Sequence, residues 1–330
     1  MGKARKETWQ AAIIAVIYLM AASVPAALAH EKNTSAQTEL KYLYAPLGPF
    51  NKVAKIDLRT EEVIAYFPVG MNPHGMAVSP DGRYIYTGQM RKMADNRVLV
   101  TDTVANKIVA TIPVGKISHH FAISKDGTYL YVTGEKLRII NTRNRKVIAQ
   151  LKTGMMPYYV SIGPGGKYIY VTNKGSNTLS ILNFPLGETV AVIPTGAGPS
   201  HIALYPPGNK LYITEAAAGT ISAIDLKKRR IVKSVKIGKD PHAIDVTPAG
   251  MIFVSARGDN AVYMIDTSSL EIKKKITVPV ADHITVGPEG KKVYVSSRPG
   301  KSIYVLDAFS GEILNKIPIE GEAHQMVLSR

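Results

Sequence analysis

A unit of about 42 residues recurs seven times in this chain of 330 residues, from Lys41 onward. One position in each unit follows a strand-like run rich in Val and Ile, and its successive copies are 45, 39, 42, 42, 40 and 42 residues apart. The residues at this position are Gly70, Gly115, Gly154, Gly196, Gly238, Val278 and Glu320. A repeat of roughly 40–45 residues with several short strands is typical of a β-propeller blade. The period therefore predicts an all-β fold built from copies of one small sheet.

Four strands can be placed in a representative unit, at residues 75–79, 84–88, 97–102 and 107–115. The third strand ends in Asp or Asn in every copy. Such side chains accept a hydrogen bond from the backbone two residues later and so begin a turn. These residues are Asp57, Asp102, Asn141, Asn183, Asp225, Asp266 and Asp307. Because the same turn signal recurs in all seven units, we expect the units to share one register.

The two ends of the repeat region complement each other. The repeats begin at the second strand of a unit, residues 41–46, and finish with a first strand, residues 324–329. Pairing of these segments would close the ring and leave no unpaired terminal edge. We therefore predict a seven-bladed β-propeller of four-stranded antiparallel blades, in one domain that spans residues 41–330.

The repeat motif is written out most fully as FPVGMNPHGMAVSPDGRYIYTGQ at residues 67–89 and KTGMMPYYVSIGPGGKYIYVTNKGSN at residues 152–177. It resembles the repeat of the YVTN family of β-propeller proteins, and the likeness extends over residues 41–330. That family includes surface-layer proteins. Related propellers include lactonases, a streptogramin lyase, the haem domain of d-type nitrite reductases and non-catalytic subunits of periplasmic redox complexes. The resemblance implies the fold, but a fold shared so widely does not assign an activity.

Residues 1–29 have the pattern of a secretory signal peptide. A basic start precedes an apolar run at residues 11–24, and small residues lead up to Ala29. The run is shorter than the roughly 20 residues of a membrane-spanning helix, which argues against the alternative of a membrane anchor. We expect cleavage after Ala29, a flexible arm at residues 30–40, and a periplasmic or secreted propeller without a transmembrane anchor.

Composition limits the chemistry and the partners of the chain. The absence of Cys excludes disulfides, thiolate metal sites and covalent c-type haem. Removal of the signal peptide lowers the formal charge from +16 to +14. A strongly basic exported protein is expected to meet an acidic protein or an anionic surface. We expect no nucleic-acid partner, because no platform of stacking aromatic residues is present, and we expect a monomeric fold.

Basic residues are concentrated near two successive third-to-fourth strand turns. Residues 227–239 hold seven basic groups and no acidic one, and three lysines follow one unit later. Lysines on an exposed outer strand discourage edge-to-edge aggregation, so this surface has a structural interpretation as well as a partner-docking one. The docking candidates are Lys227, Lys228, Arg229, Arg230, Lys273, Lys274 and Lys275.

Seven of the eight histidines lie in the short turns that lead into the first strand of each unit. We number the residue after the turn proline, or its equivalent, as position 0. Position 0 holds His74, His119, Tyr158, Ser200, His242, Asp282 and His324. Position 1 holds Gly75, His120, Tyr159, His201, Ala243, His283 and Gln325. This concentration of histidines requires a functional or structural cause.

Side chains alternate between the two faces of a strand. Position 2 is large and apolar in every unit, whereas position 3 is small or polar apart from Val327. We therefore expect position 2 to pack between blades, and positions 1 and 3 to face the central channel. This alternation predicts a ligand-binding group in the channel, composed of His120, Tyr159, His201, Asp245, His283 and Gln325. It predicts a structural role on the packing side for His74, His119, His242 and His324.

Imidazoles combined with a carboxylate suit a divalent transition metal such as Zn, Fe or Cu, or a general base oriented by an acid. The metal-ligand candidates are His120, His201, His283 and Asp245. For an enzyme, the catalytic candidates are His201, Asp245 and His283. We expect a non-catalytic binding or scaffold propeller that serves a periplasmic redox or metal-handling system. A metal-assisted lyase or lactonase and a cell-surface structural repeat protein are the alternatives.

Overall fold

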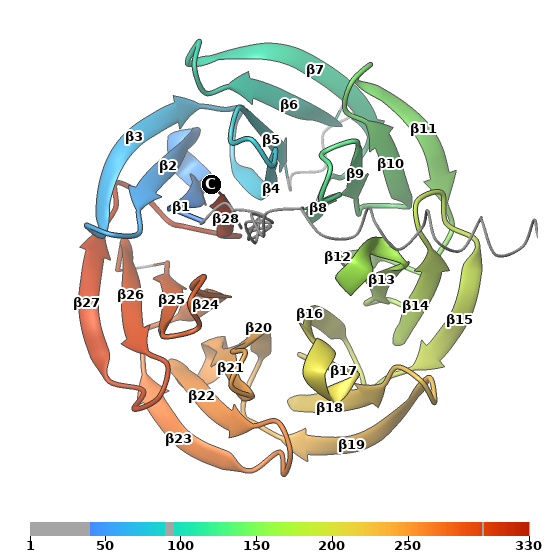
Figure 1. Ribbon diagram of the computed structural model, residues 1–330, viewed down its shortest axis with the longest axis vertical. Coiled ribbons are helices and arrows are strands. Elements are labelled where there is room, and N and C mark those ends of the chain that lie inside the picture. The colour runs from blue at the N-terminus through green and yellow to red at the C-terminus, as the bar shows by residue number, and fades with distance from the viewer. Residues whose placement is uncertain (1–39, 90–95, 299, 330) are drawn as a thin grey trace, which may run out of the picture. The chain divides into compact units, whose positions relative to one another are not determined.

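The computed structural model describes residues 40–89, 96–298 and 300–329. The expected signal peptide and the arm up to residue 39 lie outside the described residues. The described residues form seven four-stranded antiparallel sheets that surround a central axis as blades (Figure 1). The predicted seven-bladed β-propeller is confirmed. In this part of the chain no helix has the length and apolar character needed to cross a membrane.

Blade 1 has the strand order β28-β1-β2-β3, and blades 2 to 7 follow in chain order as β4–β7, β8–β11, β12–β15, β16–β19, β20–β23 and β24–β27. The inner strands are β28 (Val327–Ser329), β4 (Pro73–Val78), β8 (Phe121–Ile123), β12 (Pro157–Ile162), β16 (Pro199–Tyr205), β20 (Pro241–Val246) and β24 (Ala281–Val286). The second strands are β1 (Tyr42–Leu47), β5 (Tyr84–Gln89), β9 (Tyr129–Val132), β13 (Tyr168–Asn173), β17 (Lys210–Glu215), β21 (Met251–Ala256) and β25 (Lys292–Ser297).

The third strands are β2 (Lys52–Asp57), β6 (Asn96–Asp102), β10 (Leu137–Asn141), β14 (Thr178–Asn183), β18 (Thr220–Asp225), β22 (Ala261–Asp266) and β26 (Ser302–Asp307). The outer strands are β3 (Glu62–Pro68), β7 (Lys107–Gly115), β11 (Lys146–Leu151), β15 (Thr189–Pro194), β19 (Arg230–Lys236), β23 (Ile272–Thr277) and β27 (Ile313–Pro318). Short 3₁₀ turns occur at η1 (Gly48–Phe50), η2 (Pro164–Gly166), η3 (Pro206–Gly208) and η4 (Arg257–Asp259).

The ring closes in blade 1, where the two ends of the repeat region meet. Strand β28 pairs antiparallel with β1, with Tyr42 opposite Ser329 and Tyr44 opposite Val327. A core cluster that contains Leu43 of blade 1 and Tyr294 of blade 7 packs the first blade against the last. Closure therefore follows the predicted scheme and covers the edge that β1 would otherwise expose.

The hydrophobic core of the described residues is divided into seven clusters, one between each pair of adjacent blades. Each blade contributes in the same way. For example, Tyr44 of β1 and Met76 at position 2 of β4 belong to the cluster between blades 1 and 2, and both are almost fully buried. The expectation that position 2 packs between blades is confirmed, and this packing fixes where positions 0 and 1 begin.

The Asp and Asn residues at the ends of third strands initiate turns as expected. The Oδ1 atom of Asp57, for instance, accepts a hydrogen bond of 2.8 Å from the backbone N–H of Arg59. The same bond, to the residue two positions later, occurs at Asp102, Asn141, Asp225, Asp266 and Asp307. This repeated turn keeps the blades in one register.

Candidate functional site: a histidine cluster at the start of the inner strands

The inner strands of most blades begin with an irregularity. Pairing with the second strand skips residues between Pro73 and Met76, and the same register shift occurs in blades 4, 5, 6 and 7. Such a bulge leaves extra residues unpaired and breaks the strict alternation of side chains. Positions 0 and 1 lie within the bulge, so alternation does not sort them onto different faces. The predicted division of the histidines into a channel group and a packing group is therefore wrong.

A hydroxyl at the end of each second strand fixes the bulge in blades 3 to 7. It accepts a hydrogen bond of 2.9–3.1 Å from the backbone N–H of position 1 in its own blade. In blades 3 to 6 it also donates one of 2.6–2.8 Å to the carbonyl of position 0 in the next blade. We call these residues the clamp hydroxyls, and they are Thr133, Thr172, Thr214, Ser255 and Ser296. They set the backbone from which the histidines project.

Seven histidines lie where the inner strands begin, and all are buried. We call them the histidine cluster: His74, His119, His120, His201, His242, His283 and His324. The rings are close to one another, with centroids 4.4 Å apart for His201 and His242, and 5.0 Å apart for His201 and His283. Two tyrosines complete the arrangement, since Tyr158 packs on His119 and Tyr159 stacks on His120 at 3.9 and 3.6 Å.

Position 1 of blade 2 is a glycine because the cluster leaves no room there. A Cβ atom at Gly75 would lie 2.0 Å from the carbonyl oxygen of His119. That same carbonyl lies 3.4 Å from Nδ1 of His74. The close approach of two neighbouring turns therefore requires a residue without a side chain at this position.

Several imidazole nitrogens have no hydrogen-bond partner among the described residues. They are Nε2 of His119, His120, His201 and His283, together with Nδ1 of His324, and all are buried. The opposite nitrogen of His119 lies 2.9 Å from the carbonyl oxygen of Tyr158, to which only an N–H can donate. This tautomer leaves a free lone pair on Nε2 of His119. A ring oriented in this way by a backbone carbonyl is typical of a metal-ligating histidine.

Two groups of three histidines have the spacing of metal ligands. One group is His74, His283 and His324, and the other is His201, His242 and His283. Within each group, one ligand atom per residue lies within 4.8 Å of the other two. The first group comes from blades 7, 1 and 2, the second from blades 5, 6 and 7. His283 in blade 7 belongs to both.

One buried carboxylate lies beside the cluster. Oδ1 of Asp282 is 3.5 Å from Nε2 of His242, and its Oδ2 is 3.8 Å from Nδ1 of His324. Two guanidinium groups also reach it, from Arg257 at 3.3 Å and from Arg298 at 3.6 Å. Asp282 thus contacts one histidine from each of the two groups.

Burial governs the ionisation of these groups. It lowers the pKa of every histidine in the cluster, and for six of them the charge of a neighbouring histidine lowers it further. Burial also raises the pKa of Asp282, although Arg298 and Arg257 oppose this shift. The imidazoles are therefore held in the neutral form, which is the form that binds a metal.

The structure brings together only part of the site predicted from the sequence. His120, His201, His283 and Tyr159 lie in the cluster as expected. Asp245, proposed as a ligand and as a catalytic acid, instead accepts backbone N–H bonds of 2.8 Å from Val246 and 2.7 Å from Val286. Burial raises its pKa to about 6. Its carboxylate links the inner strands of blades 6 and 7 and is in neither group of candidate ligands.

Gln325 likewise uses its side chain to join strands. Its Oε1 accepts a hydrogen bond of 3.1 Å from the N–H of Met76, and its Nε2 donates one of 3.4 Å to the carbonyl of Phe121. Sequence reasoning gave His74, His242 and His324 a packing role and overlooked Asp282. The signal for these four residues was their shared position 0, directly before position 1, where the predicted ligand histidines lie.

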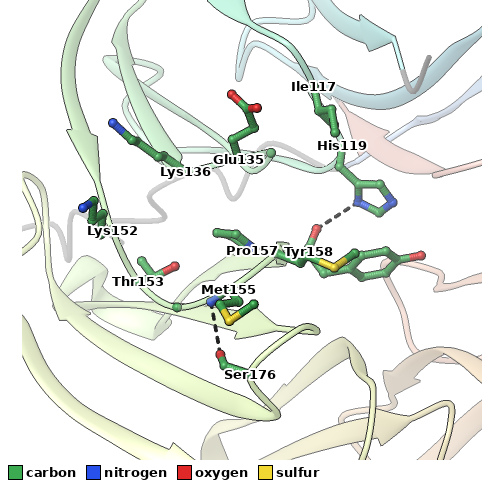
Figure 2. Close-up of a pocket in the computed structure, with 13 residues that line it drawn as sticks. Ile117, His119, Glu135, Lys136, Lys152, Thr153, Met155, Pro157, Tyr158 and Ser176 are labelled. Atoms are coloured by element: carbon green, nitrogen blue, oxygen red, sulfur yellow. Dashed lines mark hydrogen bonds between the residues drawn. The ribbon is translucent and has the colours of Figure 1, made fainter. Parts of the chain in front are cut away.

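A cavity of about 830 Å³ opens beside the cluster, between blades 3 and 4. Figure 2 shows His119 and Tyr158 at its inner end, with Met155 and Lys152 further along its wall. A second cavity of about 250 Å³ is lined by His74, His324 and Arg298. The cluster is therefore approached from two sides by spaces large enough for small molecules or ions.

The basic residues of blades 5 and 6 are exposed but partly engaged in contacts between blades. Lys233 donates a hydrogen bond to the carbonyl of Ser269 in the next blade, and Lys274 does so to Ser310. Lys273 pairs with Glu271 at 2.8 Å. These contacts agree with the structural interpretation of the outer-strand lysines, whereas Lys227, Lys228, Arg229 and Arg230 lie exposed in or next to a turn. The docking interpretation therefore depends most on residues 227–230.

Fold and site together define a class of protein, a seven-bladed propeller with a buried histidine cluster where its inner strands begin. The family model described as "Lactonase, 7-bladed beta-propeller" matches residues 138–319, more than half of the chain. The chain belongs to this family. The expected relation to lactonase-like propellers is thereby confirmed. None of the curated protein sequences compared with the chain matches it significantly.

Solved structures are similar to the chain in fold. A functionally unknown protein from Desulfotomaculum acetoxidans DSM 771 superposes with a TM-score of 0.74 at 14% identity, over 88% of this chain and 99% of that one. Kuenenia stuttgartiensis hydrazine synthase gives 0.70 at 18% identity, over 86% and 100%. Dihydro-heme d1 dehydrogenase NirN in complex with DHE gives 0.66 at 18%, over 87% and 75%. At these identities the similarity supports the fold alone.

Proposed function

We propose that this chain is an exported binding propeller that holds a transition metal in its histidine cluster and serves a redox or metal-handling system. The observation that carries the proposal is the grouping of buried imidazoles at ligand spacing, which includes the Nε2 atoms of His201 and His283 that have no partner among the described residues. A buried polar atom left unpaired costs about 1–3 kcal/mol. Several such atoms in one place are stabilised together if they share a ligand.

The donor set supports a metal over other ligands. Neutral imidazoles with oriented lone pairs suit Zn, Cu or Fe, and the chain has no thiolate to compete for the metal. The clamp hydroxyls hold the backbone of His201, His242 and His283 in place, as supporting residues do in metal sites. NirN, which shares the fold, is a dehydrogenase by name, and this agrees with the proposed setting.

The test is the metal content of full-length protein purified from an export-competent host without added metal. We expect about one or more equivalents of a transition metal, and loss of that metal in the double variant His201→Gln/His283→Gln. Gln keeps the size of the side chain while removing the imidazole. Substoichiometric metal that is unchanged in the double variant would refute the proposal. A visible absorption band in a protein whose metal content does not change in the double variant would point to a haem-like ligand instead.

A hydrolytic enzyme is the second candidate, favoured by the family match and by the contacts of Asp282. Its carboxylate near Nε2 of His242 could orient that ring as a general base, while Arg257 polarises a carbonyl group. The experiment is turnover of a panel of lactones by the protein and by Asp282→Asn. Activity that disappears in the variant supports an enzyme, and activity that the variant retains excludes this mechanism. Asp245→Asn serves as the comparison, because Asp245 bonds only to backbone.

A further inference from the structure

The two three-histidine groups form overlapping arcs around the axis. His324 and His74 come from blades 1 and 2, and His201 and His242 come from blades 5 and 6. His283 of blade 7 lies between the arcs, with its ring centroid 6.3 Å from that of His74 and 5.0 Å from that of His201. Each arc therefore has its own set of nitrogens and one residue in common.

A single ion cannot use this many ligands. Zinc takes four, at about 2.0–2.1 Å from each nitrogen. Three nitrogens around such an ion are roughly 3.4 Å apart, so each arc, with separations up to 4.8 Å, needs only small side-chain rotations to bind one. The seven imidazoles exceed the needs of one ion.

We infer that the histidine cluster binds two transition-metal ions side by side, one in each arc, with His283 as the shared ligand. When metal binding releases its ring proton to solvent, the imidazolate of His283 has a lone pair on each of its two ring nitrogens and can supply one to each ion. Asp282 lies next to His283 in the chain and contacts His242 of one arc and His324 of the other. Asp282 thus orients one ligand of each ion position without being a ligand itself. This inference rests on the proposed metal-binding function and adds the number and arrangement of the ions.

The charge around the cluster favours copper as the occupant. Among the described residues, the carboxylate that contacts the candidate ligands is that of Asp282, and it is already shared with Arg257 and Arg298. Two dications would add four positive charges to a buried site whose ligands carry only the one negative charge of the shared imidazolate, whereas two Cu(I) ions add two. Burying uncompensated charge is costly, and imidazole is a good ligand for copper. A pair of cuprous ions is therefore the state that the surroundings tolerate best.

The two ion positions differ in their access to solvent. The cavity of about 250 Å³ reaches His74 and His324, both in the first arc. Among the cluster histidines, the cavity of about 830 Å³ reaches His119, which is in neither arc. We expect the ion in the His74–His324 arc to exchange faster with a chelator than the ion in the His201–His242 arc.

The experiment is an anaerobic titration of the full-length metal-free protein with Cu(I), against a chromogenic chelator that reports free copper. We expect two equivalents for the native protein. His74→Gln and His324→Gln should each lower the value to one, and so should His242→Gln. His283→Gln should weaken both equivalents. His30→Gln is the matched control, because it removes the remaining histidine of the chain and leaves the cluster intact.

Oxidation to Cu(II) provides the second readout. Two adjacent Cu(II) ions that share an imidazole couple magnetically, so the EPR intensity should fall below the total copper content. The single-equivalent variants should regain full intensity per copper. Circular dichroism and thermal melting show whether each variant folds. If either His74→Gln or His324→Gln fails to fold, the other tests the same arc, because both residues belong to it.

Each result discriminates. Binding of no copper would refute this inference, whereas the proposed function is refuted separately, by the absence of any transition metal from the purified protein. Binding of one equivalent that His283→Gln abolishes would overturn the pair while leaving a mononuclear metal protein. Two equivalents with full, uncoupled EPR intensity would also overturn it, because the ions would then lie apart. Two coupled equivalents that separate as predicted among the variants support it.

Discussion

The hydroxyl of Thr214 in blade 5 donates a hydrogen bond of 2.6 Å to the carbonyl oxygen of His242 in blade 6. The same hydroxyl accepts a bond of 3.0 Å from the N–H of His201. One side chain therefore fixes the backbone of two histidines that belong to the same candidate metal site. The clamp hydroxyls are part of the repeat motif, and they position the backbone from which the cluster histidines project.

Replacement of Thr214 tests this link. Thr214→Val keeps the shape of the side chain but leaves the N–H of His201 and the carbonyl of His242 without their partner. We expect the free energy of unfolding to fall by about 1–3 kcal/mol, and metal affinity to fall as well. Thr214→Ser retains the hydroxyl and should behave like the native protein. Equal stability and affinity in all three proteins would contradict the role of the clamp.

The stability of the metal-free protein should depend on pH below neutrality. Burial lowers the pKa of the cluster histidines, so the unfolded chain binds protons below its ordinary histidine pKa of about 6.5 while the folded protein does not. Stability is therefore present above pH 6.5 and is lost as the pH falls. Each histidine contributes up to about 1.4 kcal/mol per pH unit.

Two carboxylates act in the opposite direction. The pKa of Asp245 is raised to about 6 and that of Asp282 is also raised, so the folded state binds their protons first, and they favour the folded state as the pH falls. Because the histidines outnumber these two carboxylates, the free energy of unfolding should still increase with pH between pH 5 and 6.5. Denaturant unfolding across this range measures it, and His201→Gln/His283→Gln should reduce it. A flat profile would show that the cluster is hydrated and titrates normally.

Removal of the charge on Asp282 should separate stability from metal binding. Asp282→Asn relieves the burial of a carboxylate, while Arg257 keeps its pair with Asp240 at 2.9 Å and Arg298 keeps its pair with Glu322 at 3.6 Å. We therefore expect a change in unfolding free energy within about 1 kcal/mol, but metal affinity lowered by roughly 10–100-fold. Chemical denaturation and copper competition measure the two effects. A loss of stability without loss of affinity would assign Asp282 a purely structural role.

The exposed basic turn of blade 5 provides the test of partner docking. The double variant Lys227→Glu/Lys228→Glu should weaken retention on an immobilised acidic polypeptide, and the native interaction should weaken as salt rises. The variant Arg143→Glu/Lys146→Glu reverses the same number of charges at the corresponding turn of blade 3 and serves as the control. If both variants lose retention equally, the interaction follows net charge and no docking site exists at residues 227–230.

Much of the fold could be predicted from the sequence because the same residue pattern occurs seven times, and each copy supports the same assignment of strands and turns. The period gave the number of blades, and the strands at residues 41–46 and 324–329 indicated how the ring closes. The apolar residues at position 2, such as Met76 and Phe121, could be assigned to the blade interfaces because alternation holds once the strand is regularly paired.

The candidate site could be predicted only in part, because it lies where regular pairing fails. In blade 6, for example, positions 0 and 1 lie in a bulge that the residue pattern does not reveal, so His242 was separated from His201 and His283, with which it groups in the structure. Alternation placed Asp245 in the channel group of candidate ligands, but its carboxylate bonds to a backbone N–H group that only the three-dimensional structure brings near. The sequence therefore located the turns that matter, but it did not indicate which side chains meet there.

The pairing of β28 with β1 has a consequence for the order of assembly. His324 lies just before β28, so it reaches His74 and His283 only when that strand joins a sheet whose other three strands were synthesised first. A chain in which blades 2 to 7 are complete but blade 1 still lacks β28 does not have His324 in place, so one arc of the cluster is incomplete. On the two-ion arrangement inferred above, the ion position that depends on His324 can therefore be filled only after the ring has closed.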